Sequence, residues 1–198
     1  MKKLVLFLAM CVLSTSALAN SGFSAELMAG SATQRIEPRL ASGNISGDDA
    51  SHGIRFGWQF WKHMAIETSY QNYGKAKELF TYFDGTSSSD WKGAFEMTAI
   101  NAGVRAIIPF ENGFSLSARG GISRWDYDAE YTQLDSGGTG FFDDDDGTDF
   151  YFGASLRYDF DNFFISGDYT VVDADIKFDG SDAEHKTKDF SFAIGRKF

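Results

Sequence analysis

Cysteine is almost absent from this sequence, and the single one is Cys11. It lies in a predicted signal peptide, residues 1–19, so the predicted mature domain, residues 20–198, contains no cysteine. A domain without cysteine has no disulfide framework, no thiolate metal site and no thiol nucleophile. Those three classes of structure and chemistry are excluded at the outset.

Long apolar runs, basic charge and proline are also scarce. Beyond residue 20 no uninterrupted apolar stretch reaches 18 residues, so no transmembrane helix is expected. The formal net charge is −10, and it becomes more negative when the lysines of the signal peptide are removed. A chain with so negative a charge repels nucleic acid, so nucleic-acid binding is not expected. There are only 2 prolines, while 16% of the residues are aromatic, a mixture that favours strands over helices.

The signal peptide is indicated by three features at the amino terminus. Lys2 and Lys3 form a short basic region, and residues 4–13 are an apolar run of about ten residues. Ala17 and Ala19 then form an A-x-A cleavage signal. The run is too short for a transmembrane helix, which needs about 20 residues. We therefore expect export, with cleavage after Ala19.

The rest of the sequence is dominated by alternation of apolar with polar or small residues. This period-two pattern is typical of strands, and each segment can cross a bilayer as a tilted strand. The segments lie near residues 23–30, 54–60, 66–71, 100–106, 114–122, 152–160, 163–171 and 190–195.

The connections between these segments alternate in length. Short turns are expected near 61–63, 109–113 and 161–162. Long polar segments lie near 32–51, 74–92, 129–148 and 173–188. Outer-membrane barrels have short periplasmic turns and long extracellular loops. The sequence thus predicts an all-β fold: an eight-stranded antiparallel up-and-down transmembrane β-barrel, with long extracellular loops, formed by residues 20–198.

The strand face opposite the bulky apolar residues carries small and charged residues. A soluble lipocalin-like barrel would turn the bulky face inward, but it would overfill the narrow interior of eight strands. We therefore place the charges inside, where they are costly unless paired, and predict an interior salt-bridge network of structural function. Its predicted members are Glu26, Arg55, Glu67, Arg105, Arg119, Arg157 and Asp168.

Aromatic residues gather at both ends of the predicted strands, as in the girdles of outer-membrane barrels. At the short-turn ends they are Trp58, Trp61, Tyr158, Phe160, Phe163 and Phe164. At the long-loop ends they are Tyr70, Tyr73, Trp125 and Tyr127.

Several segments resemble the OmpA-like family of small outer-membrane β-barrels. They are Ile66–Gly74, Ser117–Trp125, Asp149–Tyr158 and a final strand that ends in Phe198. The resemblance implies a location in the outer membrane of a Gram-negative bacterium, and recognition of Phe198 by the outer-membrane assembly machinery. Arg196 departs from the family pattern, because an outward aromatic residue is usual there. We expect no peptidoglycan-binding domain, and hence no tethering to the cell wall.

The expected function is non-enzymatic, with no cofactor and no catalytic or metal-binding residue. The expected partners are outer-membrane lipid and lipopolysaccharide, the assembly machinery and, as the resemblance implies, a host or surface ligand on the loops. A minor small-solute channel and a lipid A-modifying hydrolase are the alternatives. A hydrolase would need histidine to activate serine. His63 is expected in a periplasmic turn, and His52 and His185 in or beside loops, with no suitably placed serine. The spacing of Asp143–Asp146 does not match an EF-hand calcium loop.

Deletion of Phe198 tests the assembly signal. We expect less protein assembled in the outer membrane, while the assembled fraction keeps nearly the stability of the full chain, because one ring at a strand end contributes little. The measurement is the heat-modifiable band on unheated SDS gels of isolated outer membranes, followed by urea unfolding of the assembled fraction. Wild-type amounts of assembled protein would show that Phe198 is not such a signal.

Overall fold

The computed structural model describes residues 22–38, 45–83, 88–134, 140–178 and 181–198, and the predicted signal peptide lies outside these ranges. Eight strands make up nearly all of the described residues. Their bounds are β1 Phe23–Pro38, β2 Ile45–Trp61, β3 Met64–Phe83, β4 Ser88–Pro109, β5 Phe114–Gln133, β6 Gly140–Phe160, β7 Phe163–Phe178 and β8 Ser181–Lys197.

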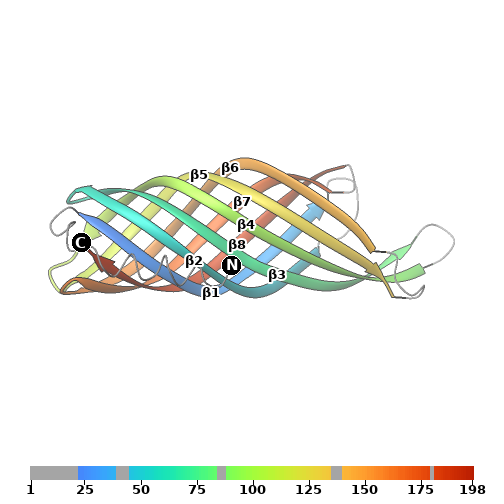
Figure 1. The fold of residues 1–198 in the computed structure, drawn as a ribbon, viewed down its shortest axis with the longest axis horizontal. Helices are drawn as coiled ribbons and strands as arrows, with labels where there is room; N and C mark the ends of the chain where they lie inside the picture. Colours follow the sequence, from blue (N-terminus) through green and yellow to red (C-terminus); the bar gives the residue numbers. More distant parts are fainter. Residues whose placement is uncertain (1–21, 39–44, 84–87, 135–139, 179–180) are drawn as a thin grey trace.

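The strands form one closed antiparallel barrel in which each strand pairs with its neighbours in sequence (Figure 1). β8 closes the ring by pairing with β1, from Lys197 opposite Ser24 to Ala183 opposite Pro38. Closure gives every strand a partner on both edges, which a barrel in hydrocarbon requires because unpaired backbone groups are costly there. The predicted all-β ring of eight strands is confirmed. Among the described residues, no helix is long and apolar enough to cross a membrane.

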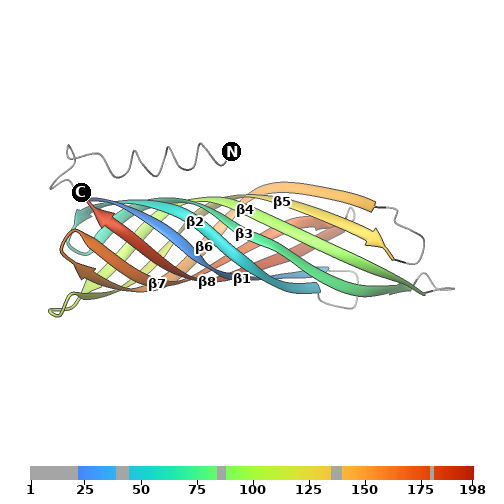
Figure 2. The same ribbon diagram turned by 60° about the horizontal axis from the view of Figure 1, so that its bottom comes forward.

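The two ends of the barrel differ (Figures 1 and 2). The three short connections follow Trp61, Pro109 and Phe160, as predicted, and lie at the same end as the carboxyl terminus. At the other end, most of the segments predicted to be long loops are instead strand. Residues 140–148, for example, pair with β5 from Thr132 to Arg124. The barrel therefore continues well beyond the segments that the apolar alternation marked.

Large apolar residues dominate the outer surface of the barrel in the half near the short turns. Leu27, Ile100, Ile122 and Phe192 are each more than half exposed there. Further along the same strands the outward residues become charged, as in Asp126, Asp128, Asp144 and Asp146 on β5 and β6. The apolar band is the part that a bilayer would cover. We call the remainder, at the end opposite the short turns, the extension.

The polarity of the interior changes in the opposite direction to that of the outer surface. Inside the extension, one cluster of buried residues is almost entirely apolar. Its members are Ala32, Ile36, Tyr73, Phe95, Met97, Ala99, Trp125, Tyr127, Ala129, Tyr151, Val172, Ala174, Ile176 and Ala183. The extension is thus arranged like a water-soluble barrel, with an apolar core and a charged surface. The lipid-facing half has the reverse arrangement, with charged residues inside.

This core corrects part of the predicted aromatic girdles. Tyr73, Trp125 and Tyr127 are at most 2% exposed and lie inside the extension instead of at a lipid interface. Phe164, at the other end, is also fully buried. Only Tyr70 of the predicted long-loop girdle faces outward. The prediction was wrong because it assumed that the strands end where the lipid-facing pattern ends.

A bulge in β3 lies at the boundary between the two halves. The register with β4 shifts between Asn72 and Lys75. Gly74 adopts a φ of 80°, and a Cβ there would lie 2.6 Å from the carbonyl oxygen of Ala50. Asn72 Oδ1 accepts a hydrogen bond from the Gly74 amide at 2.7 Å, and Asp49 Oδ2 accepts one from the Lys75 amide at 2.6 Å. Side chains thus satisfy backbone donors where the ladder is interrupted.

His185 of β8 lies among the apolar side chains of the extension and is fully buried. Its ring meets that of Tyr127 edge-on at 5.2 Å, and its Nε2 lies 3.4 Å from Thr187 Oγ1. Its Nδ1 has no hydrogen-bond partner among the described residues. Burial lowers the pKa of His185 to about 4, since the charged imidazolium would lose its hydration.

We expect the contribution of His185 to stability to fall as the pH drops from about 6.5 toward 4, and then to level off. In this interval the unfolded chain binds a proton at His185 that the folded barrel does not, so protonation favours unfolding. The loss attributable to His185 is about 3 kcal/mol, at about 1.4 kcal/mol per pKa unit. It is measured as the difference between wild type and His185→Leu in urea unfolding at pH 7.5, 5.5 and 4. Parallel pH profiles for the two proteins would contradict the expectation.

Candidate functional site: the interior charge network

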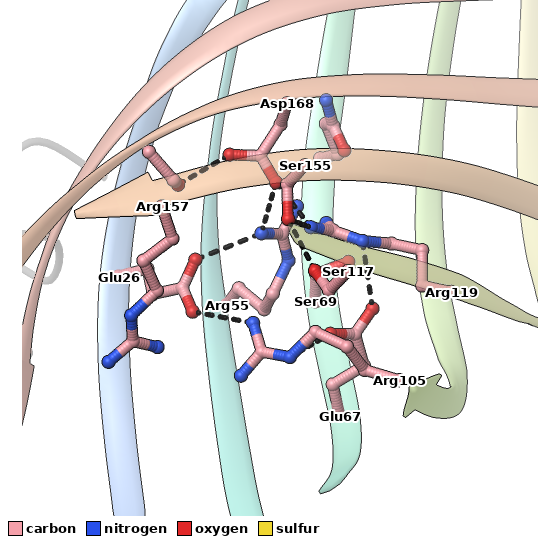
Figure 3. A network of polar contacts seen from close by, with 12 residues as sticks. Glu26, Arg55, Glu67, Ser69, Arg105, Ser117, Arg119, Ser155, Arg157 and Asp168 are labelled. Carbon is pink, nitrogen blue, oxygen red and sulfur yellow. Dashed lines mark hydrogen bonds and ion pairs between the residues drawn. The ribbon is translucent and has the colours of Figure 1, made fainter. Parts of the chain in front are cut away.

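Six charged side chains from six different strands meet inside the lipid-facing half of the barrel (Figure 3). All six are at most 5% exposed. They are Glu26 of β1, Arg55 of β2, Glu67 of β3, Arg105 of β4, Arg119 of β5 and Asp168 of β7. The strand register places them at one level, since Glu26 is directly opposite Arg55 and Arg105 is directly opposite Arg119.

The six charges form a closed cycle of alternating sign, which we call the ion-pair ring. Glu26 binds Arg55 at 2.9 Å and Arg105 at 3.3 Å. Glu67 lies 3.7 Å from Arg105 and 3.6 Å from Arg119. Asp168 closes the cycle by binding Arg119 and, at 2.9 Å, Arg55. Every charge thus has two neighbours of opposite sign, and the three arginines balance the three carboxylates.

Hydroxyl groups add hydrogen bonds to three members of the ring, Asp168, Glu67 and Arg119. Ser166 Oγ donates to Asp168 Oδ2 at 2.6 Å, and Tyr151 Oη donates to Glu67 Oε1 at 3.3 Å. Arg119 donates to Ser155 Oγ at 2.9 Å, and that hydroxyl also shares a hydrogen bond of 2.7 Å with Ser117 (Figure 3). Buried ions need such additional partners, because the ion pairs alone do not repay the lost hydration.

Glycine makes room for the ring on the same inner wall. A Cβ at Gly103 would lie 2.7 Å from Tyr151 Oη, and one at Gly153 would lie 3.3 Å from Arg119 Cγ. An eight-stranded interior is only just wide enough for side chains. Small residues beside long arginines are therefore a steric requirement of the ring.

Arg157, the seventh predicted member, makes no ion pair with the other six. It binds Asp159, two residues along β6, at 2.8 Å. Its guanidinium lies 3.3 Å from the ring centre of Phe164. The predicted single network thus corresponds to a six-membered ring plus a separate Arg157–Asp159 pair. Because Arg157 pairs with Asp159 on its own strand, it is not part of the ion-pair ring.

Alternation in the sequence places several arginines inside the barrel as candidate partners of Glu67, and it favours Arg55 and Arg105. Glu67 lies within 4 Å of Arg105 and Arg119, whereas Arg55 binds Glu26 and Asp168 instead. Choosing among them requires the strand register and the tilt of the barrel. Alternation alone gives neither.

Sequence reasoning missed a fourth buried carboxylate, outside the ion-pair ring. Asp189 of β8 is fully buried and accepts hydrogen bonds from Ser51 and, at 2.7 Å, from Gln71 Nε2. It lies opposite Ala32 in β1. In the sequence it falls between the predicted long loop, near 173–188, and the predicted strand segment, near 190–195. Its inward position follows from Phe190 being outward, so the strand period contains the signal.

The remaining predicted sites are placed as follows. The backbone amide of Phe198 donates to Phe23 O at 2.9 Å, and the Arg196 guanidinium lies 5.3 Å from the Phe198 ring centre. Recognition of Phe198 during assembly stays a prediction. The Asp143–Asp146 segment is part of β6, with Asp144 directly opposite Asp128. Among the described residues, no group of three or more possible ligands could hold a metal ion.

The three histidines lie in three different surroundings. His63 Nδ1 lies 3.1 Å from Ile107 O, beside a short turn. His185 is inside the extension, and His52 faces outward on β2. Within the described ranges no hydrogen bond joins a histidine to a serine.

Glu67→Ala tests the ion-pair ring. Removing one partner of a buried ion pair typically costs about 3–5 kcal/mol, since the other charges are left uncompensated. We expect Glu67→Ala to lower the free energy of unfolding by this amount, and the neutral double change Glu67→Ala/Arg105→Ala to cost less than the sum of its single changes.

The matched control is Arg124→Ala, which breaks the exposed pair of Arg124 with Asp146. It should cost no more than about 1 kcal/mol. All variants are compared by urea unfolding from lipid vesicles. A Glu67→Ala effect as small as that of Arg124→Ala would show that the ring carries no buried charge.

The sequence matches the outer membrane protein beta-barrel domain family over residues 4–198. Comparison with curated proteins found no match. Among solved structures, the chain is similar to Ail, the attachment invasion locus protein of Yersinia pestis, with 16% identity and a TM-score of 0.51, covering 87% of this chain and 97% of Ail.

Two further similar structures are Neisserial surface protein A and OprG of Pseudomonas aeruginosa. The first has 18% identity and a TM-score of 0.55, and the second 9% and 0.56, each covering 90% of this chain and 98% of the other. At such identities the likeness shows the fold alone. The family match over almost the whole chain decides the identity: this chain belongs to the outer membrane protein beta-barrel domain family and is located in the outer membrane.

Proposed function

We propose that the protein is a non-enzymatic surface barrel, closed to solutes, that contributes to envelope integrity and contacts external surfaces through its extension. The observation that carries this proposal is the reversal of polarity along the barrel. A segment with an apolar core and a charged exterior is built to stand in water. The extension is therefore a rigid structure that projects from the membrane.

The packed interior supports a closed barrel. The ion-pair ring fills the lipid-facing half, and the apolar cluster around Trp125 and Tyr127 fills the extension. At the short-turn end, Phe164 is fully buried beneath the Arg157 guanidinium. A solute would have to displace all three layers. This favours the closed barrel over the alternative of a small-solute channel.

The exterior of the extension indicates the kind of surface that it can meet. A shallow groove of about 420 Å³ lies across β4, β5 and β6, and its lining is mainly acidic. The charged residues that line it are Lys75, Glu96, Asp126, Asp128, Glu130, Asp144, Asp145 and Asp146. Ail has been solved in complex with sucrose octasulfate, a heparin analogue. On this chain a polyanion would be repelled from that face, so we expect a neutral or basic partner surface.

The hydrolase alternative has less support. It requires a histidine beside a serine at the lipid interface, and the described residues provide no such hydrogen-bonded pair. Lipid A mass spectra from cells with and without the protein would reveal a hydrolase as a change in acyl-chain number.

Shortening the extension tests the proposal. Lys77 and Ala94 are directly opposite each other in β3 and β4. Replacing residues 78–93 with Asn-Gly joins them by a two-residue hairpin turn and keeps the register. We expect cells with this variant to lose adherence to surfaces that cells with the full barrel bind, while the lipid-facing half and its heat-modifiable band remain.

Planar-bilayer recordings of the intact protein provide the second readout. We expect no stepwise conductance from either the full or the shortened barrel, since the ion-pair ring remains in both. Conductance steps in the intact protein would overturn the closed barrel in favour of the channel. Unchanged adherence of the shortened variant would overturn the role of the extension.

A further inference from the structure

A hollow lies in the lipid-facing surface, between β6, β7 and β8. It has a volume of about 350 Å³, and its lining is almost wholly apolar. Among the residues around it are Phe114, Leu156, Ile165, Gly167 and Phe192. Three of the outward side chains around it, Leu156, Ile165 and Phe192, are large and at least half exposed. The hollow is therefore a local feature of this face.

Gly167 is the cause of the hollow. It occupies an outward position of β7, directly opposite Leu156 on one side and Phe192 on the other. A Cβ at this position would find only Phe192 Cε1, at 4.0 Å. Most other glycines of the barrel face a backbone or side-chain atom within 3 Å. Steric fit alone therefore does not require glycine here.

A lysine lies above the hollow, at the edge of the apolar band. Lys188 of β8 is exposed and lies opposite Val171 of β7 and Thr33 of β1. It is four residues from Phe192 along the strand, or about 13 Å at 3.3 Å per residue. The exposed rings of Phe190 and Tyr169 lie between the lysine and the hollow.

The charge of Lys188 is available to a ligand. No ion pair joins it to any described residue, whereas Lys186, the next outward residue, binds Asp173 at 3.2 Å and Glu184 at 3.0 Å. On the β5–β6 side of the barrel, Arg124 at the same edge is bound to Asp146. Acidic residues follow it there, so that side repels phosphate. Lys188 thus provides positive charge at the lipid boundary where an anionic headgroup could bind it.

We propose that the face formed by β7 and β8 binds one lipid A molecule of the outer leaflet. One phosphate binds Lys188, and one acyl chain passes over Phe190 and Tyr169 and fills the hollow at Gly167. The two contacts reinforce each other because they lie on one line along β8, with an apolar path between them. Lipid A is the phosphate-bearing lipid on this side, since Lys188 lies toward the extension, at the end opposite the carboxyl terminus. The proposal goes beyond the proposed function, and it does not depend on whether the barrel conducts or adheres.

Two substitutions separate the headgroup from the acyl chain. Lys188→Glu should weaken binding of lipid A about tenfold, since a membrane-surface lysine contributes about 1 kcal/mol and the reversal adds repulsion. Gly167→Leu fills the hollow, and should weaken binding about threefold or more by removing the buried path of the chain. Both positions face outward, so neither change disturbs the ion-pair ring.

The experiment is native mass spectrometry of the full barrel in detergent, titrated with bisphosphorylated lipid A, with dephosphorylated lipid A and with phosphatidylglycerol. The controls are Lys77→Glu, an exposed lysine on β3, and Ala102→Leu, an outward residue on β4. A heat-modifiable band confirms that each variant is folded. We expect one lipid A molecule to bind each wild-type and each control barrel. Lipid A should bind both test variants more weakly, and the other two lipids should bind the wild-type barrel more weakly than lipid A does.

Three results would overturn the proposal. Equal binding of dephosphorylated lipid A would remove the role of Lys188, and equal binding of phosphatidylglycerol would remove the selectivity for lipid A. A barrel dimer that Gly167→Leu abolishes, with no bound lipid, would show that a second copy occupies the hollow. None of these results bears on conductance or adherence, so the proposed function is tested separately.

Discussion

The closed ring of backbone hydrogen bonds is the constraint on which the rest of this structure depends. Eight paired strands fix the width of the interior along the whole barrel, while the surroundings outside change from lipid to water. Side chains along each strand alternate in and out without regard to this change. The apolar and the polar residues of each strand therefore have to exchange faces at the boundary between lipid and water. The outward residues then suit their surroundings, and the inward residues still fill the same width.

The ion-pair ring is the solution for the half in which the outward set is apolar. The inward set must then fill the interior without adding net charge, and Glu26, Glu67 and Asp168 alternate with three arginines to do so. In the extension, where water covers the outside, apolar side chains fill the same width at lower cost. Between the two lies a layer of hydrogen-bonding groups, in which Gln71 donates to Asp189 and Gln34 donates to the carbonyl of Tyr73. The polarity of the interior thus changes in steps.

The alternation of the sequence was enough to predict the number of strands, the short turns and the inward direction of the ring residues. It could not predict which charges touch. Arg119 reaches Glu67 only because of the tilt and register of β3, β4 and β5, and Arg157 has its own partner in Asp159. These are properties of the closed barrel, and no single strand carries them.

The extension, in contrast, was predictable in principle. In β5 the apolar residues are at even positions up to Ile122 and at odd positions from Trp125 onward, while the strand continues unbroken. In β4 they change in the same way, between Ile100 and Ala99. Such a change of phase without a turn was interpreted as the end of a strand. Since a one-residue slip exchanges the faces of a strand, it marks the level at which the surroundings of a continuous strand change. In a membrane barrel, that level is the surface of the lipid.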